Sequence, residues 1–260
     1  DLIIKSCSFT NVTSNGFGGA IYYDSATCCI SISDCTFENA FSDNGHAIYI
    51  HMNSSLKANI FNCNFIDCCS KNDKNTFMII LDSFYFDFSY NEISFSDLEQ
   101  SCNIINSSLL NYHCYNDNLF KNIKNSEEFE SPIINEISND DTITIIIENN
   151  TFENINSNCQ GRCINVNIMN PSLLKLSNNS IINCSSGSFY LKISFQSEIT
   201  SFDIDSFKFI NNEISVNLMT EFYSCPQILI QNKIINDEPG IFDLNFVNCY
   251  FENNFNQKKG

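Results

Sequence analysis

The sequence predicts an all-β protein, a right-handed parallel β-helix of about nine coils with about 28 residues in each coil. An apolar anchor residue recurs at nine positions, and a short β pattern recurs upstream of most of them. Asn and Ser supply the turns, and few segments have the 3.6-residue apolar period of an amphipathic helix. Because one such coil cannot bury its own apolar side, it must stack on copies of itself.

One coil is clearest in residues 29–50. Ile30 and Ile32 share one face of a strand, whereas Phe37 has the opposite parity, so the chain must turn a corner between two strands. A polar turn follows, and residues 47–50 form a third strand. This unit of three short strands separated by bends is the predicted repeat.

The anchor position defines the repeat along the whole chain. Its spacings are 27–32 residues, except for the last, which is 42. The anchors, which we expect to form one continuous internal stack, are Phe9, Phe37, Phe65, Ile93, Phe120, Phe152, Ile181, Phe209 and Phe251. Two positions before them lie Cys7, Cys35, Cys63, Asn91, Asn118, Asn150, Asn179, Phe207 and Cys249.

A column of Asn residues follows the anchors by two positions. Its members are Asn11, Asn39, Asn122, Asn154, Asn183, Asn211 and Asn253. Side-chain amides stacked at a bend can hydrogen-bond from coil to coil, as in cross-β ladders. The column therefore predicts a structural amide ladder.

Residues 1–260 are predicted to form one β-helix domain, a fragment of a longer chain. The repeats are cleanest over residues 1–70, and residues 99–142 form a looser, loop-rich middle. Within that middle, residues 107–118 are interpreted as a loop and residues 124–142 as an acidic insertion. The 42-residue spacing before the last anchor leaves two alternatives, an extra coil with weak markers or a looped-out insertion.

Three short motifs carry a resemblance. GGAIYY (18–23), GHAIYI (45–50) and CTFEN (35–39) resemble repeats of the polymorphic outer-membrane-protein type, and the wider class of right-handed β-helix proteins that includes Cys- and Asn-rich surface proteins of protists. The resemblance implies a non-enzymatic protein at the cell surface or secreted, acting in adhesion or ligand display. It implies a host or matrix protein, or a glycan, as the partner.

Charge excludes several classes of partner. The net charge is −17 and the pI is about 4.3. Such an acidic chain is not expected to bind nucleic acid or an anionic membrane surface, since both would require a basic face on the protein. The sequence contains no apolar run of about 18 residues, so no membrane span is predicted in it. No signal peptide is predicted in this stretch either. A surface or secreted location therefore rests on the resemblance alone.

The fourteen cysteines allow two interpretations. Cys7, Cys35 and Cys63 occupy equivalent positions, and coils stack about 4.8 Å apart, which suits either disulfides or a ladder of buried free thiols. We favour the free thiols, because a chain this long does not need covalent cross-links. Cys159 and Cys163 have poor spacing for zinc and no His nearby, so neither a metal nor a cofactor is predicted.

The main alternative is a carbohydrate-active enzyme, a lyase or hydrolase, with its site on the loops of residues 99–145. Such an enzyme needs clustered carboxylates or Ca²⁺ with a basic partner. Arg162 is the one Arg of the chain. The available candidates are Asp140, Asp141, Glu148, His113 and Lys121, and we expect that they do not converge. No catalytic residue is therefore assigned. A purely structural spacer is the third hypothesis.

Overall fold

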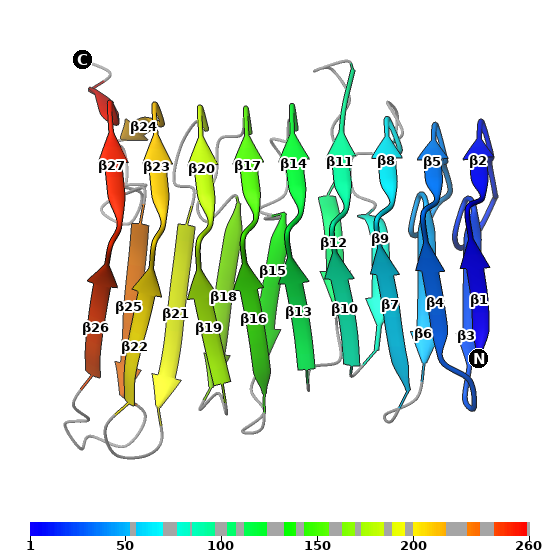
Figure 1. Cartoon of the computed structure of the whole chain (residues 1–260), viewed down its shortest axis with the longest axis horizontal. Helices are drawn as coiled ribbons and strands as arrows, with labels where there is room; N and C mark the ends of the chain where they lie inside the picture. The colour runs from blue at the N-terminus through cyan, green and yellow to red at the C-terminus, as the bar shows by residue number, and fades with distance from the viewer. Residues whose placement is uncertain are drawn as a thin grey trace.

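The computed structural model of the chain describes fourteen segments, to which all structural statements below refer. They are residues 1–52, 56–69, 77–83, 85–96, 103–107, 112–123, 133–138, 143–155, 163–169, 173–184, 189–195, 200–216, 228–234 and 242–258. Strands are the only regular elements in these segments. All pairings between them are parallel, so the all-β parallel solenoid predicted from the sequence is confirmed (Figure 1).

The first face of the solenoid is a sheet of nine strands, which are the first strands of successive coils. They are β1 (Leu2–Lys5), β4 (Ile30–Ser33), β7 (Lys57–Phe61), β10 (Tyr85–Ser89), β13 (Tyr112–Asn116), β16 (Thr144–Glu148), β19 (Leu173–Ser177), β22 (Thr200–Asp205) and β26 (Phe242–Val247). Inward residues of this sheet are mostly Ile, Leu and Phe, which suit a half-buried pleated surface.

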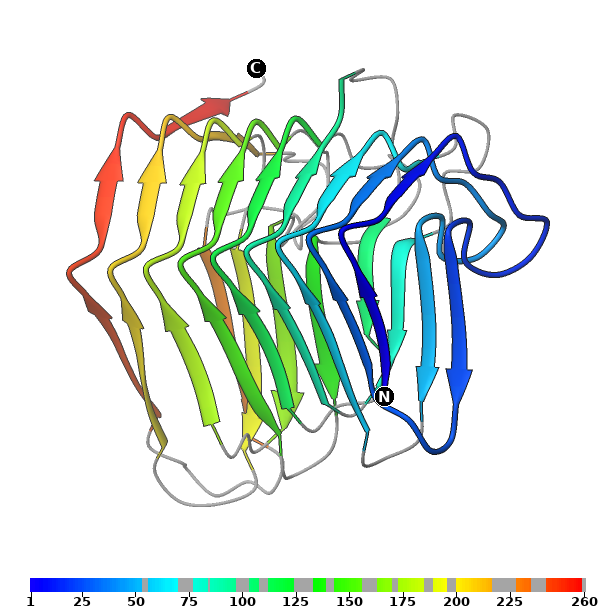
Figure 2. The same ribbon diagram turned by 45° about the vertical axis from the view of Figure 1, so that its right-hand side comes forward.

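The second face is a sheet of nine shorter strands that carry the anchors. They are β2 (Ser8–Thr10), β5 (Thr36–Glu38), β8 (Asn64–Ile66), β11 (Glu92–Ser94), β14 (Leu119–Lys121), β17 (Thr151–Glu153), β20 (Ser180–Ile182), β23 (Lys208–Ile210) and β27 (Tyr250–Glu252). Figure 2 shows the first and second faces meeting along a straight row of corners.

The third face is divided. One sheet of four strands holds β3 (Ile21–Ser25), β6 (Ile48–Met52), β9 (Phe77–Asp82) and β12 (Asn103–Ser107), and another holds β15 (Ile134–Ser138), β18 (Ile164–Met169), β21 (Phe189–Phe195) and β25 (Ile228–Ile234). Two further strands, β24 (Glu213–Val216) and β28 (Phe255–Lys258), pair only with each other.

The number of complete coils differs from the predicted nine. Two faces hold nine strands each, but the described strands of the third face number eight and form two separate ladders of four. Within the described residues the last coil has no strand on that face, since β28 pairs with β24 and not with β25. In Figure 1 the chain ascends along the first face, descends behind it and advances away from the N-terminus, which makes the coil right-handed.

The corners explain the abundance of Asn and Ser. Seventeen non-Gly residues have positive φ, and they form two columns, one at each end of the second-face strands. Asn, Asp and Ser occupy sixteen of these positions, since their short polar side chains tolerate the left-handed region best after Gly. Gly18, with φ 57°, forms a tight bend before β3.

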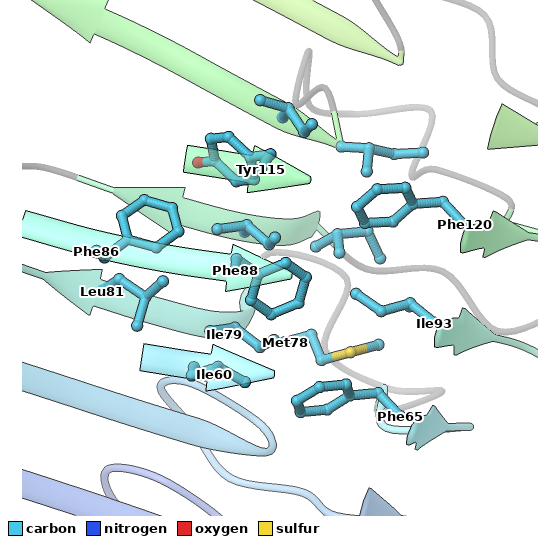
Figure 3. Close-up of a cluster of buried hydrophobic side chains, with 14 of the residues drawn as sticks. Ile60, Phe65, Met78, Ile79, Leu81, Phe86, Phe88, Ile93, Tyr115 and Phe120 are labelled. Carbon is cyan, nitrogen blue, oxygen red and sulfur yellow. The ribbon is translucent and has the colours of Figure 1, made fainter. Parts of the chain in front are cut away.

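The anchors form the predicted internal stack. Each anchor is the direct register partner of the next, from Phe9↔Phe37 through Phe209↔Phe251. The rings of Phe37 and Phe65 are parallel with centroids 4.8 Å apart. Figure 3 shows Phe65 and other anchors facing the inward side chains of the first and third faces. Phe251 is 53% exposed because no further described coil covers it.

The loop-rich middle predicted for residues 99–142 is partly wrong. It contains the regular strands β12 to β15, and the predicted loop at 107–118 includes β13. The inward residues of β13 are His113 and Tyr115, so this strand lacks the apolar alternation that marks its neighbours. Most of the acidic insertion at 124–142 lies outside the described residues.

The structure also decides between the two interpretations of the 42-residue spacing. Strands β22 and β23 pair directly with β26 and β27. Among the described strands no additional coil separates them on either nine-stranded face, which excludes the extra coil there and leaves the insertion. Part of this insertion forms β24.

Candidate functional site

A groove of about 330 Å³ lies on the outer side of the first face, across β7 and β10. Its lining residues are Lys57, Asn59, Phe61, Asp87, Ser89 and Tyr90. The volume is at the lower end of the range of small-molecule sites. The lining includes a cation, a carboxylate, an amide, two hydroxyls and two aromatic rings.

Strand alternation places these side chains outside. Ala58 and Ile60 of β7 point into the core, as do Phe86 and Phe88 of β10, and all four are at most 1% exposed. The residues between and beside them must therefore point outward. The parallel register aligns Asn59 with Asp87 in the middle of the groove.

The groove contains both a positively charged and a negatively charged side chain, those of Lys57 and Asp87. Within it the Ser89 hydroxyl donates a hydrogen bond to one carboxylate oxygen of Asp87. Lys57 makes no ion pair with any side chain of the described chain, and the half-buried amide of Asn59 makes no hydrogen bond there. Polar groups without protein partners are available to a ligand.

Tyr90 at the end of the groove has an unfavourable backbone conformation. Its φ is 58°, and it stands in the corner column where the other coils have Ser, Asp or Asn. A bulky aromatic residue in the left-handed region costs about 1–3 kcal/mol. Its side chain is 61% exposed, so burial of the ring does not offset this free-energy cost. Such an outlier motivates a functional hypothesis.

The coil beside the groove carries a thiol that is poorly suited to nucleophilic catalysis. Cys114 of β13 is the register partner of Asp87. Burial, and secondarily the charge of Asp87, raises the pKa of this thiol to about 11. Because the thiolate is the nucleophilic form, Cys114 is unreactive at neutral pH.

The structure separates the described members of the enzyme candidate set. His113 points into the core and is fully buried. Lys121 pairs with Glu92 on the outside of the second face, with Nζ and Oε1 2.5 Å apart. Glu148 pairs with Lys175 on the first face at 2.8 Å. Asp140 and Asp141 lie outside the described residues.

His113 belongs to a buried polar network that sequence reasoning missed. Its Nδ1 lies 3.1 Å from both carboxyl oxygens of Glu136, and the Tyr115 hydroxyl donates to Glu136 at 2.6 Å. Nε2 lies 3.2 Å from the carbonyl oxygen of Ser83, so this nitrogen carries a proton. All three network side chains are fully buried, and we assign the network a structural role.

The cysteine column is aligned as predicted. Cys35 and Cys63 are buried free thiols, and the Cys7 backbone N–H donates to the Cys35 sulfur. Cys7 itself is exposed, contrary to the prediction, because it belongs to the first coil. Ten described cysteines are free, and Cys69 is disulfide-bonded. Cys159 lies outside the described residues.

A cluster of exposed aromatic residues lies on and beside the third face. Tyr22 and Tyr49 are register partners on β3 and β6 with ring centroids 5.7 Å apart, and Phe17 packs 4.8 Å from Tyr49. Phe17 and Tyr22 are about half exposed, at 48% and 53%. Neighbouring coils thus align outward aromatic side chains into a patch.

None of the described segments is a helix that could cross a membrane. The described His, Cys, Asp and Glu residues form no group of three or more placed to hold a metal ion. Comparison of the chain with protein-family models, curated proteins and solved structures finds no match.

Proposed function

We propose that this chain is a non-enzymatic β-helix scaffold that displays a ligand-binding face in adhesion, at a cell surface or after secretion. The observation that carries the proposal is the groove with Tyr90 at its end. Packing does not account for a strained, exposed aromatic residue beside polar side chains that lack partners in the described chain, whereas ligand binding would.

Two further features support this proposal. The outward aromatic patch at Phe17, Tyr22 and Tyr49 supplies rigid, amphipathic contact area of the kind enriched at binding surfaces. The likeness of residues 18–23, 35–39 and 45–50 to repeats of polymorphic outer-membrane proteins and of protist surface proteins supports the location. A host or matrix protein, or a glycan, is the proposed partner.

The enzyme alternative receives less support. A lyase or hydrolase needs several acid–base groups held together on a rigid face. The groove contains one carboxylate, that of Asp87, and its cation comes from Lys57. The described candidates His113, Lys121 and Glu148 belong to three separate environments.

The test is to incubate the purified domain with acidic and neutral polysaccharides, with and without Ca²⁺. Released reducing ends and unsaturated products are measured in parallel with retention of the domain on the immobilised polysaccharides and on matrix proteins. We expect retention without product. Turnover that disappears in the Asp140→Asn, Asp141→Asn double variant would establish the enzyme instead.

A further inference from the structure

We infer that the groove on the first face binds a neutral sugar, one pyranose residue of a glycan chain. This inference rests on the proposed function and names the ligand class of the same site. It follows from the size of the groove, its hydrogen-bonding groups, its two rings and the charge of the chain.

The polar groups of the groove match hydroxyl groups. Lys57 offers donors only, Asp87 offers acceptors, and the amide of Asn59 offers both. The side chains of Asn59 and Lys57 make no hydrogen bond or ion pair in the described chain, while the Asp87 carboxylate already accepts a hydrogen bond from Ser89. A ligand hydroxyl can donate to the carboxylate and accept from the ammonium group. Adjacent hydroxyls on one ring can therefore use this alternating set.

The aromatic residues supply an apolar surface beside the polar groups. Phe61 is 40% exposed and Tyr90 is 61% exposed. No ring contact joins them, although both line the groove. Each ring face is therefore available to the C–H face of a sugar ring, which combines an apolar face with a polar rim. A purely polar ligand would leave these rings in water.

Charge selects a neutral ligand. The chain has a net charge of −17, so an anionic polysaccharide is repelled at a distance. An organic cation would be attracted to the chain but would meet the ammonium group of Lys57 inside the groove. A neutral glycan meets neither obstacle.

The experiment uses the whole chain and isothermal titration with four probes. The neutral probes are cellotriose, maltotriose and N,N′,N″-triacetylchitotriose, and the acidic probe is trigalacturonate. We expect at least one neutral probe to bind with a dissociation constant in the millimolar range or below. We expect the acidic probe to bind more weakly than that neutral probe.

Substitution of Tyr90 separates binding from folding. Tyr90→Asn removes the ring but installs the residue found at the same corner in Asn62, Asn149 and Asn178. We expect this variant to unfold at a urea concentration no lower than the unsubstituted chain, yet to bind the sugar about tenfold more weakly. Tyr250→Asn is the matched control, since Tyr250 is also an exposed tyrosine (50%) but lies on the second face, and its affinity should not change.

Three results would overturn the inference: no binding of any neutral probe at millimolar concentration, tighter binding of trigalacturonate, or unchanged affinity of Tyr90→Asn. Failure of the proposed function is distinguishable from these. New reducing ends released from the bound probe would show an enzyme and leave sugar binding in the groove intact. Retention on a matrix protein without sugar binding would support the adhesion function and refute only the inference that the groove binds a sugar.

Discussion

The sharpest test of the fold is to remove one side chain from the buried amide ladder, and Asn150→Ala does so at its centre. The ladder consists of Asn91, Asn118, Asn150 and Asn179, which occupy one inward column and are at most 2% exposed. Asn150 accepts hydrogen bonds from the backbone N–H and the side-chain amide of Asn118, at 3.1 and 2.9 Å. Its own amide donates to the carbonyl of Tyr115 and to the Asn179 side chain, both at 3.0 Å.

The expected cost follows from the groups that lose partners. In Asn150→Ala, the backbone N–H of Asn118 and one N–H of its side-chain amide lose their acceptor inside a dry core. A buried group left unsatisfied costs about 1–3 kcal/mol, so two such donors predict a loss of about 2–6 kcal/mol in unfolding free energy. The second N–H of Asn118 keeps its bond to the carbonyl of Phe88 at 2.8 Å.

A matched control is available in the exposed Asn column. Asn154 also bonds coil to coil, donating to Asn122 at 3.0 Å, but water can replace that bond. Its φ is 56°, so Asn154→Gly removes the side chain without backbone strain. We expect this variant to lose less than about 1 kcal/mol.

Both variants are compared by urea unfolding, with hydrogen exchange of the Asn118 amide as a local probe. Exchange is needed because a solenoid can lose coils separately and does not guarantee a two-state transition. We expect Asn150→Ala to shift the midpoint strongly and to remove protection at Asn118. If Asn150→Ala costs no more than Asn154→Gly, the reasoning about the buried ladder is wrong.

Three further predictions concern the core and its thiols. Phe37→Ala should cost about 3–5 kcal/mol in urea unfolding, because Phe37 is buried between two anchors, whereas Phe251→Ala should cost far less. Burial raises the pKa values of Cys63 and Cys68 from 9.0 to about 12, so folded thiols stay protonated where unfolded ones ionise. The stability that these thiols contribute is therefore present below about pH 9 and is lost as the pH rises from about 9 to 12, by roughly 1 kcal/mol per thiol at pH 10. Unchanged thermal stability from about pH 8 to 10 would contradict this. Alkylation of the folded, non-reduced protein should label the exposed Cys28 and spare Cys63 until urea is added, and mass spectrometry decides it.

The sequence predicted the parts of the fold that depend on periodicity. Phe37 and its equivalents are apolar, evenly spaced and flanked by corner residues, so their register could be read without coordinates. Strand β13 was missed because its inward residues, His113 and Tyr115, are polar or amphipathic. Their partner Glu136 comes from another strand, and only the stacked coils bring the three together. The burial of a polar residue can be predicted only when the partner that satisfies its hydrogen bonds is known.

The groove was missed for a different reason. Most of its lining residues are ordinary outward residues of two strands, and their proximity depends on the register of β7 and β10. One signal was nevertheless present in the sequence. The residue three positions before the anchor is Ser, Asp or Asn in every coil except one, where Tyr90 precedes Ile93. The backbone of this column has positive φ, which favours Ser, Asp and Asn. A Tyr at such a position is therefore a candidate for a functional role.

The cysteines and the buried asparagines have one structural role in common. The Asn91 amide donates to the carbonyl of Ile60 in the preceding coil, and the Cys63 thiol has the same relation to Ile32. Asn91 also accepts from the backbone N–H of Cys63, which closes that end of the ladder. At the other end of the ladder, the next residue in the column is Phe207, which has no side-chain amide to accept a hydrogen bond from Asn179. The Asn179 amide donates to the backbone carbonyls of Ile147 and Ser177. Cysteine is thus a weaker and more apolar substitute for asparagine at this corner, so a cysteine-rich column can form here without disulfides.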